Sequence, residues 1–253
     1  MRLIQKGAEP FYFQGGPVGC LLVHGFTGAP KEMLDLGRHL AGQGHTVHGV
    51  RLFGHATRVE EMPRARWQDW LASVEDGYHL LNGQCDQIVI MGLSMGGILS
   101  LTLAARLPVS GVVAMSTPFS MPSDPRLRFV RLLSLFVKRV GKDEPDWVDP
   151  EAAADHIDYP YYPTRSIVEL RDLIDEMQAG LGRLTVPVLI IHSRTDGGVP
   201  PQNAEDLLAA LGSQDKSLHW IERSGHVITR DIGRQRVFEL AAAFVRKVAG
   251  AKA

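Results

Sequence analysis

The chain has 253 residues, 45% of them hydrophobic, which is enough to bury a large core in one α/β domain, with or without an insertion. Its 27 Lys and Arg and 28 Asp and Glu residues exclude a global charge that would draw nucleic acid or an anionic membrane to the surface. Cys20 and Cys85 belong to no metal-ligand spacing, so we expect buried free thiols in a reducing compartment. The N-terminus has no apolar segment long enough for a signal peptide, and we expect a cytoplasmic protein.

Apolar runs alternate with stretches of helical spacing along most of the chain. This alternation predicts a mainly parallel sheet that is covered by helices on both faces. The expected strands are residues 8–13, 18–25, 45–50, 86–92, 109–116, 186–193 and 217–222, and the expected helices are residues 31–43, 67–82, 96–107, 203–211 and 233–248.

The alternation breaks between Thr117 and Val186. These residues contain no convincing strand but two helical patterns, "PRLRFVRLLSLFVKRV" and "SIVELRDLIDEMQAG". The second pattern begins with a capping box from Ser166 to Glu169. We therefore expect an inserted helical cap, with the core formed by residues 1–117 and 187–253 and the cap by residues 118–186.

One uncharged segment, Gln87 to Ala105, approaches the length of a membrane span. Its glycine and hydroxyl residues instead indicate a strand that turns sharply into a helix, so we expect no stable membrane insertion. The segment contains "GLSMG", a GxSxG pattern, which is a weak signal by itself in a chain with 26 glycines. Between a strand and a helix, however, this pattern indicates a nucleophile elbow around Ser94. The alternative is a glycine-rich turn whose serine only caps the helix.

Residues after two later strands are expected to complete a catalytic triad with Ser94. His226 follows the last predicted strand, so it lies at the same sheet edge as the elbow and is the expected base. Asp196 follows "VLIIHSRT" directly and is expected to orient that histidine. Asp231 is the alternative acid, but an acidic residue near the start of a helix usually compensates the helix dipole. The order Ser94, Asp196, His226 is that of α/β-hydrolase triads.

The negative charge of an acyl-transfer intermediate needs hydrogen-bond donors. One expected donor is the backbone N–H of Met95, directly after Ser94. The other is the backbone N–H of Phe26 in "HGFTG", where His24 is expected to shape the loop. Taken alone, "HGFTG" also fits a plain turn at the end of a strand.

Four segments together, "LLVHGFTG", "GLSMGG", "HSRTDGGVP" and "ERSGHVI", resemble the bacterial carboxylesterases that are similar to monoacylglycerol lipases, in the α/β-hydrolase superfamily. The resemblance extends from "PFYF" to the last helix. It implies an α/β-hydrolase fold, with a mainly parallel central sheet flanked by helices and an inserted helical cap, and no metal or organic cofactor. It also implies that Ser94 is the nucleophile, His226 the base and Asp196 its orienting acid, with Phe26 and Met95 as oxyanion donors.

These residues predict a serine carboxylic ester hydrolase that forms an acyl-enzyme and acts on a small-molecule ester, either a short- to medium-chain acyl ester or a monoacylglycerol. A thioesterase, acyltransferase, peptidase or C–C bond hydrolase could use the same residues, and a non-catalytic ligand receptor is a further alternative. The segment "RLFGHA" departs from many relatives, and Phe53 and Ala56 are expected to reshape the rim of the pocket.

The cap is expected to set the acyl specificity. In "PRLRFVRLLSLFVKRV", apolar residues recur at intervals of three and four, so we predict that one face of this helix, together with the helix from Ile167 to Met177, lines an acyl tunnel above Ser94. The alternatives are a helix that only packs on the domain and a basic amphipathic helix that rests on a lipid surface. The expected pocket residues are Leu133, Phe136, Ile167 and Val199.

Overall fold

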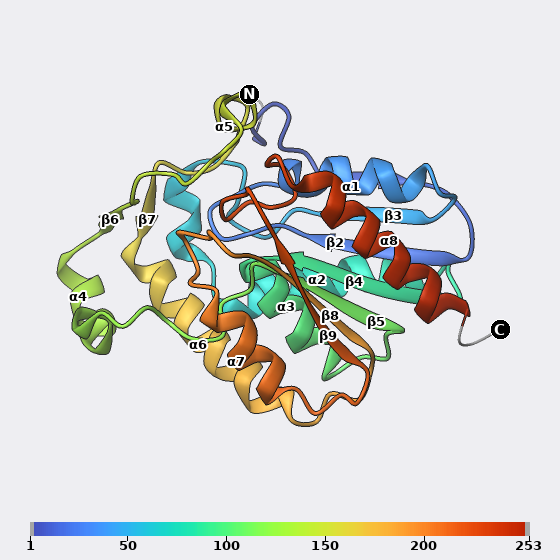
Figure 1. The fold of residues 1–253 in the computed structure, drawn as a ribbon. Coiled ribbons are helices and arrows are strands. Elements are labelled where there is room, and N and C mark those ends of the chain that lie inside the picture. The colour runs from blue at the N-terminus through green and yellow to red at the C-terminus, as the bar shows by residue number, and fades with distance from the viewer. Residues whose placement is uncertain (1–2, 251–253) are drawn as a thin grey trace.

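A seven-stranded sheet with helices on both faces forms the centre of the computed structural model, which describes residues 3–250 (Figure 1). The predicted core also includes residues 1–2 and 251–253, which lie outside the described residues. The strand order is β1-β3-β2-β4-β5-β8-β9, and only β1 with β3 is antiparallel, so the predicted mainly parallel sheet is confirmed. The strands are β1 Phe11–Phe13, β2 Val18–Val23, β3 Thr46–Val50, β4 Gln87–Leu93, β5 Gly111–Met115, β8 Val188–Ser193 and β9 Lys216–Ile221.

Two hydrophobic layers enclose the sheet. Successive residues of β4 point to opposite faces, so Ile90 packs into one layer and Met91 into the other. Both residues are fully buried, as expected for a parallel strand that is covered on both sides. The flanking helices are α1 Lys31–Ala41, α2 Trp67–Asn82, α3 Met95–Ala104, α6 Thr164–Leu181, α7 Gln202–Ala210 and α8 Arg234–Gly250.

The parallel arrangement brings the loops that follow four strands to one edge of the sheet. In the register of β2 and β4, Val23 lies opposite Gly92, and in the register of β8 and β9, Ser193 lies opposite Ile221. The carboxyl ends of these strands are therefore level with each other. The loops after β2, β4, β8 and β9 meet at that edge, which is where ligands bind in open α/β sheets.

The insertion between β5 and β8 departs from the sequence prediction. A short antiparallel pair, β6 Arg139–Gly141 with β7 Tyr161–Pro163, lies where we expected no strand. The predicted long helix is instead a 3-10 helix, η2 Pro125–Phe129, followed by the seven-residue α4 Val130–Phe136. The helix ends because Val137 adopts an extended conformation that leads into β6. Helix α5, Pro150–Ala154, lies between the two strands in the chain.

Helix α6 begins at Thr164, two residues before the predicted capping box. Ser166 therefore lies inside the first turn, and the predicted box does not form. Glu169 instead pairs with Arg66 and accepts the backbone N–H of Trp67 at 3.1 Å. Helix α6 belongs to the predicted cap but packs along α3 of the predicted core. The boundary between cap and core therefore stays a prediction. Across residues 3–250, no helix combines the length and the apolar character needed to cross a membrane.

Candidate active site

The predicted nucleophile lies on a strained turn between β4 and α3. Ser94 has φ 55° and ψ −120°, a conformation that is rare for a residue with a side chain. Its backbone N–H donates to the carbonyl of Met115 at 2.7 Å. A Cβ on Gly92 would lie 2.0 Å from the carbonyl oxygen of Gly96, so only glycine permits this sharp turn from strand to helix. The local geometry is that of the nucleophile elbow predicted from "GLSMG".

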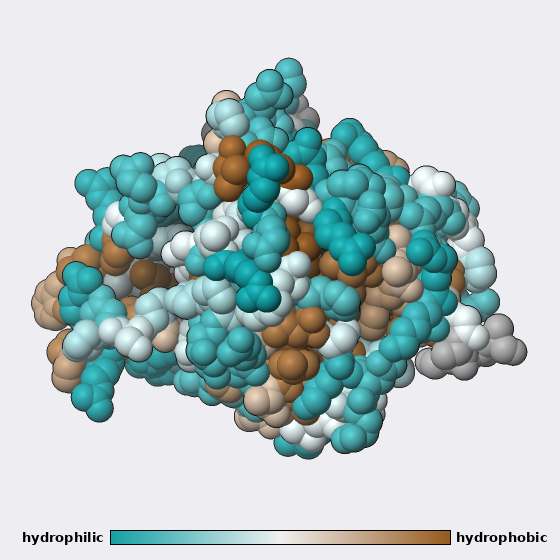
Figure 2. All heavy atoms as spheres, in the orientation of Figure 1, coloured by the Kyte–Doolittle hydropathy of each residue, from teal (hydrophilic) through white to brown (hydrophobic). Residues whose placement is uncertain are grey.

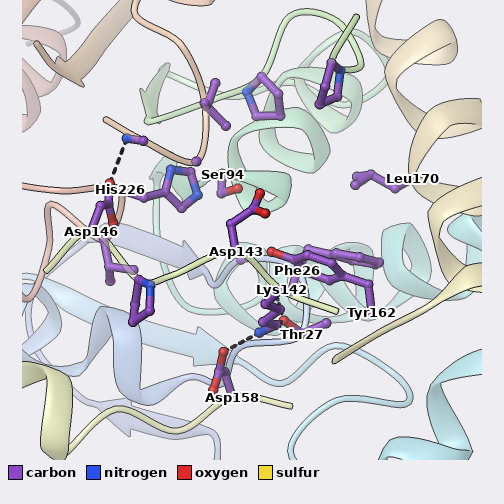
Figure 3. Close-up of a pocket in the computed structure, with 18 of the residues that line it drawn as sticks. Phe26, Thr27, Ser94, Lys142, Asp143, Asp146, Asp158, Tyr162, Leu170 and His226 are labelled. Atoms are coloured by element: carbon purple, nitrogen blue, oxygen red, sulfur yellow. Dashed lines mark hydrogen bonds and ion pairs between the residues drawn. The ribbon is translucent and has the colours of Figure 1, made fainter. Parts of the chain in front are cut away.

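His226 and Asp196 meet at the same edge of the sheet. The Nδ1 atom of His226 lies 3.0 Å from each carboxylate oxygen of Asp196, whose side chain is fully buried. Asp196 Oδ1 also accepts the backbone N–H groups of Gly198 at 2.9 Å and Val199 at 2.7 Å. Figure 3 shows Ser94 beside the imidazole of His226. The structure thus brings the three side chains of the predicted triad together.

Charge and hydrogen bonding prepare this pair for proton transfer. Burial raises the pKa of Asp196. The charge of His226 and the hydrogen bonds from His192 and His226 lower it by a larger amount, so the net pKa lies below its usual range. Burial lowers the pKa of His226, but the charge and hydrogen bond of Asp196 reverse this effect, and its net pKa lies above 6.5. Nδ1–H of neutral His226 donates to the carboxylate, which leaves Nε2 to accept a proton.

The predicted oxyanion donors both lie next to the elbow. Met95 is the first residue of α3, where a backbone N–H has no acceptor within the helix. Phe26 follows β2 and lines the same cavity as Ser94, and its ring stacks on Tyr162 with 5.7 Å between ring centroids. Their roles as donors stay predictions. The part of the chain that the structure describes contains no group of three or more His, Cys, Asp or Glu residues placed to hold a metal ion.

Sequence reasoning missed the carboxyl group that supports the loop after β2, which carries the predicted oxyanion donor Phe26 and is called the oxyanion loop below. Glu32 on α1 is buried, and its Oε2 accepts the backbone N–H of Gly25 at 2.7 Å, one residue before Phe26. Burial raises the pKa of Glu32 to about 7, although that N–H group and the charge of His226 lower it. The only sequence signal was an acidic residue in the first turn of a helix, which usually serves the helix dipole.

A second missed residue, His192, lies at the end of β8 and is fully buried. Its Nε2 atom lies 2.9 Å from the carbonyl oxygen of Val199 and 3.2 Å from Asp196 Oδ2. His192 therefore holds the turn that carries Asp196, the predicted acid. Because it lies inside an apolar strand, the sequence pattern indicated only a core residue.

Asp231, the alternative acid, is fully buried but serves the backbone. Its carboxylate accepts the N–H groups of Gly225 at 2.7 Å, Asp149 at 2.8 Å and Val148 at 3.1 Å. These bonds tie the loop before His226 to the insertion. They differ from the predicted interaction with the helix dipole, because Asp231 binds loop N–H groups ahead of α8.

None of the residues of the segment "RLFGHA" is among those that line the cavity that contains Ser94. Phe53 is 45% exposed and lines a separate surface depression, and Ala56 is buried, so the expected effect of these two residues on the pocket rim is wrong. His24 accepts the N–H of Leu52 at 3.2 Å and donates to the carbonyl of Gly25 at 2.9 Å. It therefore shapes the loop, as predicted, by joining two segments.

A cavity of about 370 Å³ opens beside Ser94. Ile167 and Val199 line it as predicted, but Leu133 and Phe136 do not. Phe136 is 78% exposed, because the short α4 packs on α6 through Val130 and the rest of the helix faces outward at the edge of the molecule (Figure 1). Hydrophobic atoms are visible on the surface at this end of the molecule (Figure 2). Leu127 of the same predicted helix face does line the cavity, from η2, whereas the prediction for Leu133 and Phe136 is wrong.

Comparison with known proteins agrees with this geometry. The serine aminopeptidase S33 family matches residues 19–233. The chain belongs to this family of α/β-hydrolases. It is 38% identical over 251 residues to a thermostable monoacylglycerol lipase of Bacillus sp. strain H-257, which covers 98% of each chain. It is 32% identical over 244 residues to a carboxylesterase of Bacillus subtilis strain 168, which covers 95% of this chain and 97% of the relative.

Solved structures give the same result. One from work on the metagenome-derived lipolytic enzymes LipS and LipT is 33% identical, has a TM-score of 0.91 and covers 96% of this chain and 99% of its own. The monoacylglycerol lipase of Paleococcus ferrophilus, at 18% identity, shares the fold with a TM-score of 0.82 and covers 95% and 98% of the two chains. The chain is thus a serine ester hydrolase, and the predicted fold, family and reaction class are confirmed.

Proposed function

We propose that the chain hydrolyses esters of one acyl chain with a small polar alcohol, monoacylglycerols among them, through Ser94, His226 and Asp196. The bond from His226 Nδ1 to Asp196, with Ser94 beside the imidazole, is the observation that carries the proposal. This arrangement is the one expected for a nucleophile (Ser94), a base beside it (His226) and an acid that orients the base (Asp196).

The reaction has two steps. Ser94 Oγ attacks the ester carbonyl carbon while His226 Nε2 takes the hydroxyl proton, and Asp196 stabilises the imidazolium that forms. The backbone N–H groups of Phe26 and Met95 hold the negative oxygen. His226 then gives its proton to the departing alcohol, which leaves an acyl-enzyme. Water attacks this acyl-enzyme, again with His226 as the base, and releases the carboxylic acid and free Ser94.

The two walls of the cavity match the two ends of such an ester. Ile167, Leu170 and Ile174 of α6 form an apolar wall that suits the acyl chain. Thr27 and Lys142, with the carboxylates of the insertion, form a polar wall that suits a hydroxylated alcohol (Figure 3). A volume of about 370 Å³ is near the lower end for ligand pockets, which supports short- to medium-chain acyl groups. The monoacylglycerol lipase at 38% identity supports the same substrate class.

The proposed place of this activity is the cytoplasm. Cys20 and Cys85 are both buried and free, and unpaired thiols of this kind suit a reducing compartment. A small-molecule ester is the proposed partner, with no nucleic acid and no stable membrane insertion, since the formal net charge is only −1.

Ser94→Ala tests the triad. We expect a loss of kcat on the order of 10⁶, with an unchanged melting temperature and no labelling by a fluorophosphonate probe. Activity within tenfold of the wild type, in protein free of contaminating esterase, would contradict the assignment.

A substrate panel tests the alcohol and acyl preferences. For 4-nitrophenyl esters from acetate to palmitate, kcat/KM should rise roughly two- to fourfold per carbon until the cavity is filled, and then fall. Matched monoacylglycerols, thioesters and peptides separate the other reaction classes. A higher kcat/KM for the thioester or the peptide than for the ester would contradict the proposal.

A further inference from the structure

One segment of the insertion, residues 142–149, contacts three of the loops that form the active site. We call this segment the strap. At its first residue, Lys142 Nζ donates to Thr27 Oγ1 at 2.8 Å, next to the oxyanion residue Phe26. Lys142 also pairs with Asp158 (Figure 3). The start of the strap is thereby joined to the oxyanion loop.

The middle of the strap contacts the loop of the catalytic acid. Asp146 Oδ2 accepts the backbone N–H of Gly197 at 2.8 Å, and Gly197 directly follows Asp196 (Figure 3). The next glycine is equally constrained, since a Cβ on Gly198 would lie 3.0 Å from Cγ of His226. Asp146 therefore fixes the backbone where the acid loop passes the base.

The same residue contacts the loop of the base. A Cβ on Gly225, directly before His226, would lie 2.3 Å from the backbone carbonyl oxygen of Asp146 and 2.6 Å from its carboxyl carbon. Asp231 holds both partners in place, because it accepts the N–H of Gly225 and those of Val148 and Asp149 in the strap. The strap and the base loop thus share one buried carboxylate.

We propose that Asp146 is a positioning residue for catalysis, which holds the acid loop and the base loop in register and stabilises the imidazolium of His226 with its charge. The proposal rests on the triad proposed above. It adds to that triad a residue from the insertion, 50 positions before Asp196 in the chain.

Electrostatics supports the geometry. Burial lowers the pKa of His226, and the carboxylates of Asp196, Asp146 and Glu32 raise it. Lys142, Asp143, Glu144 and Asp158 also line the cavity that contains His226. Among the three carboxylates that raise this pKa, Asp146 is the one that the insertion supplies.

Asp146→Asn is the decisive variant, because the amide keeps an oxygen that can accept the N–H of Gly197 but loses the charge. Without this charge the pKa of His226 falls, so the acid limb of the pH profile, where kcat/KM declines as His226 is protonated, should move to lower pH by roughly 0.3 to 1 pH unit. The same shift should appear in a Glu32→Gln background, where the carboxyl group of Glu32, whose pKa is raised to about 7, is absent. Glu151→Gln is the matched control, since Glu151 is an exposed acid of the insertion, on α5, and its loss should leave the acid limb in place.

Asp146→Ala removes the hydrogen bond as well. We expect kcat to fall roughly 10- to 100-fold while KM changes less than threefold, as for a misplaced catalytic group. If this variant does not fold, the pH profile of Asp146→Asn still decides. An acid limb of Asp146→Asn that coincides with the wild type overturns the proposal, and an inactive Ser94→Ala in the same series shows that the triad itself stands.

Discussion

Replacing Glu32 with Gln should remove a pH-dependent loss of stability from the oxyanion loop. In the folded protein, burial raises the pKa of Glu32 to about 7, against an ordinary value of 4.5. Between these two values the folded state binds more protons than the unfolded state. The contribution of Glu32 to the free energy of unfolding is therefore greatest below pH 4.5, falls as the pH rises to about 7, and is constant above that.

The size of the effect follows from the shift. A pKa that moves from 4.5 to about 7 corresponds to about 3 kcal/mol, because each pKa unit is worth about 1.4 kcal/mol. Relative to the wild type, Glu32→Gln should therefore gain about 3 kcal/mol between pH 4.5 and pH 8. For a chain of this length, this gain corresponds to roughly 6–12 °C in melting temperature. The glutamine keeps an oxygen that can accept the N–H of Gly25.

Thermal unfolding of both proteins at one scan rate, from pH 4.5 to pH 8, measures this difference. Asp35→Asn on the same helix is the control, because the side chain of Asp35 is 44% exposed and pairs with Arg38 on the surface. Its difference from the wild type should stay within about 1 kcal/mol at every pH. Melting curves of Glu32→Gln that run parallel to the wild type across this range would refute the reasoning.

Three further outcomes are expected. Asp196→Asn should lower kcat on the order of 10⁴, whereas Asp231→Asn should lower kcat far less. Both variants should lower the melting temperature, because each removes a buried carboxylate that accepts backbone N–H groups, two at Asp196 and four at Asp231. Gly92→Ala should destabilise the fold by about 3 kcal/mol or more, measured by urea unfolding, since its Cβ would lie 2.0 Å from a backbone oxygen. Ile167→Phe should shorten the preferred acyl chain in the 4-nitrophenyl ester series, and Phe136→Ser, at a 78% exposed position, should leave it unchanged.

The sheet, and the meeting of Ser94, Asp196 and His226 at one of its edges, were predictable because local patterns determine them. Ile88 to Leu93 is an apolar run with a glycine turn directly after it, and the same signal recurs before Asp196. In a parallel sheet such runs end at one edge, so the residues that follow them meet even though the chain separates Ser94 and His226 by more than a hundred positions.

The insertion was not predictable in the same way. Residues 125–140 have a clear helical period, yet only Val130–Phe136 forms an α-helix, because Arg139 begins a strand that pairs with Pro163. That pairing joins residues more than twenty positions apart, and no local period reports it. Asp231 and Asp146 were missed as structural residues for a related reason. Each accepts at least one backbone N–H from a residue far away in the chain. Every residue type except proline carries this group, so the sequence pattern does not reveal which N–H is bound.

The active site is held together largely by carboxylates that accept backbone N–H groups. Glu32 holds the oxyanion loop, Asp196 the turn after β8, Asp146 the backbone of Gly197, and Asp231 the base loop. At Gly225 the strap approaches too closely for a side chain, and at Gly198 the imidazole of His226 leaves little room for one, so these two positions can be held only through their backbone groups. Charged acceptors make stronger bonds to N–H groups than neutral ones, which suits backbone that must stay in place. The cost is negative charge gathered around one histidine, and that charge is also what favours the imidazolium during the reaction.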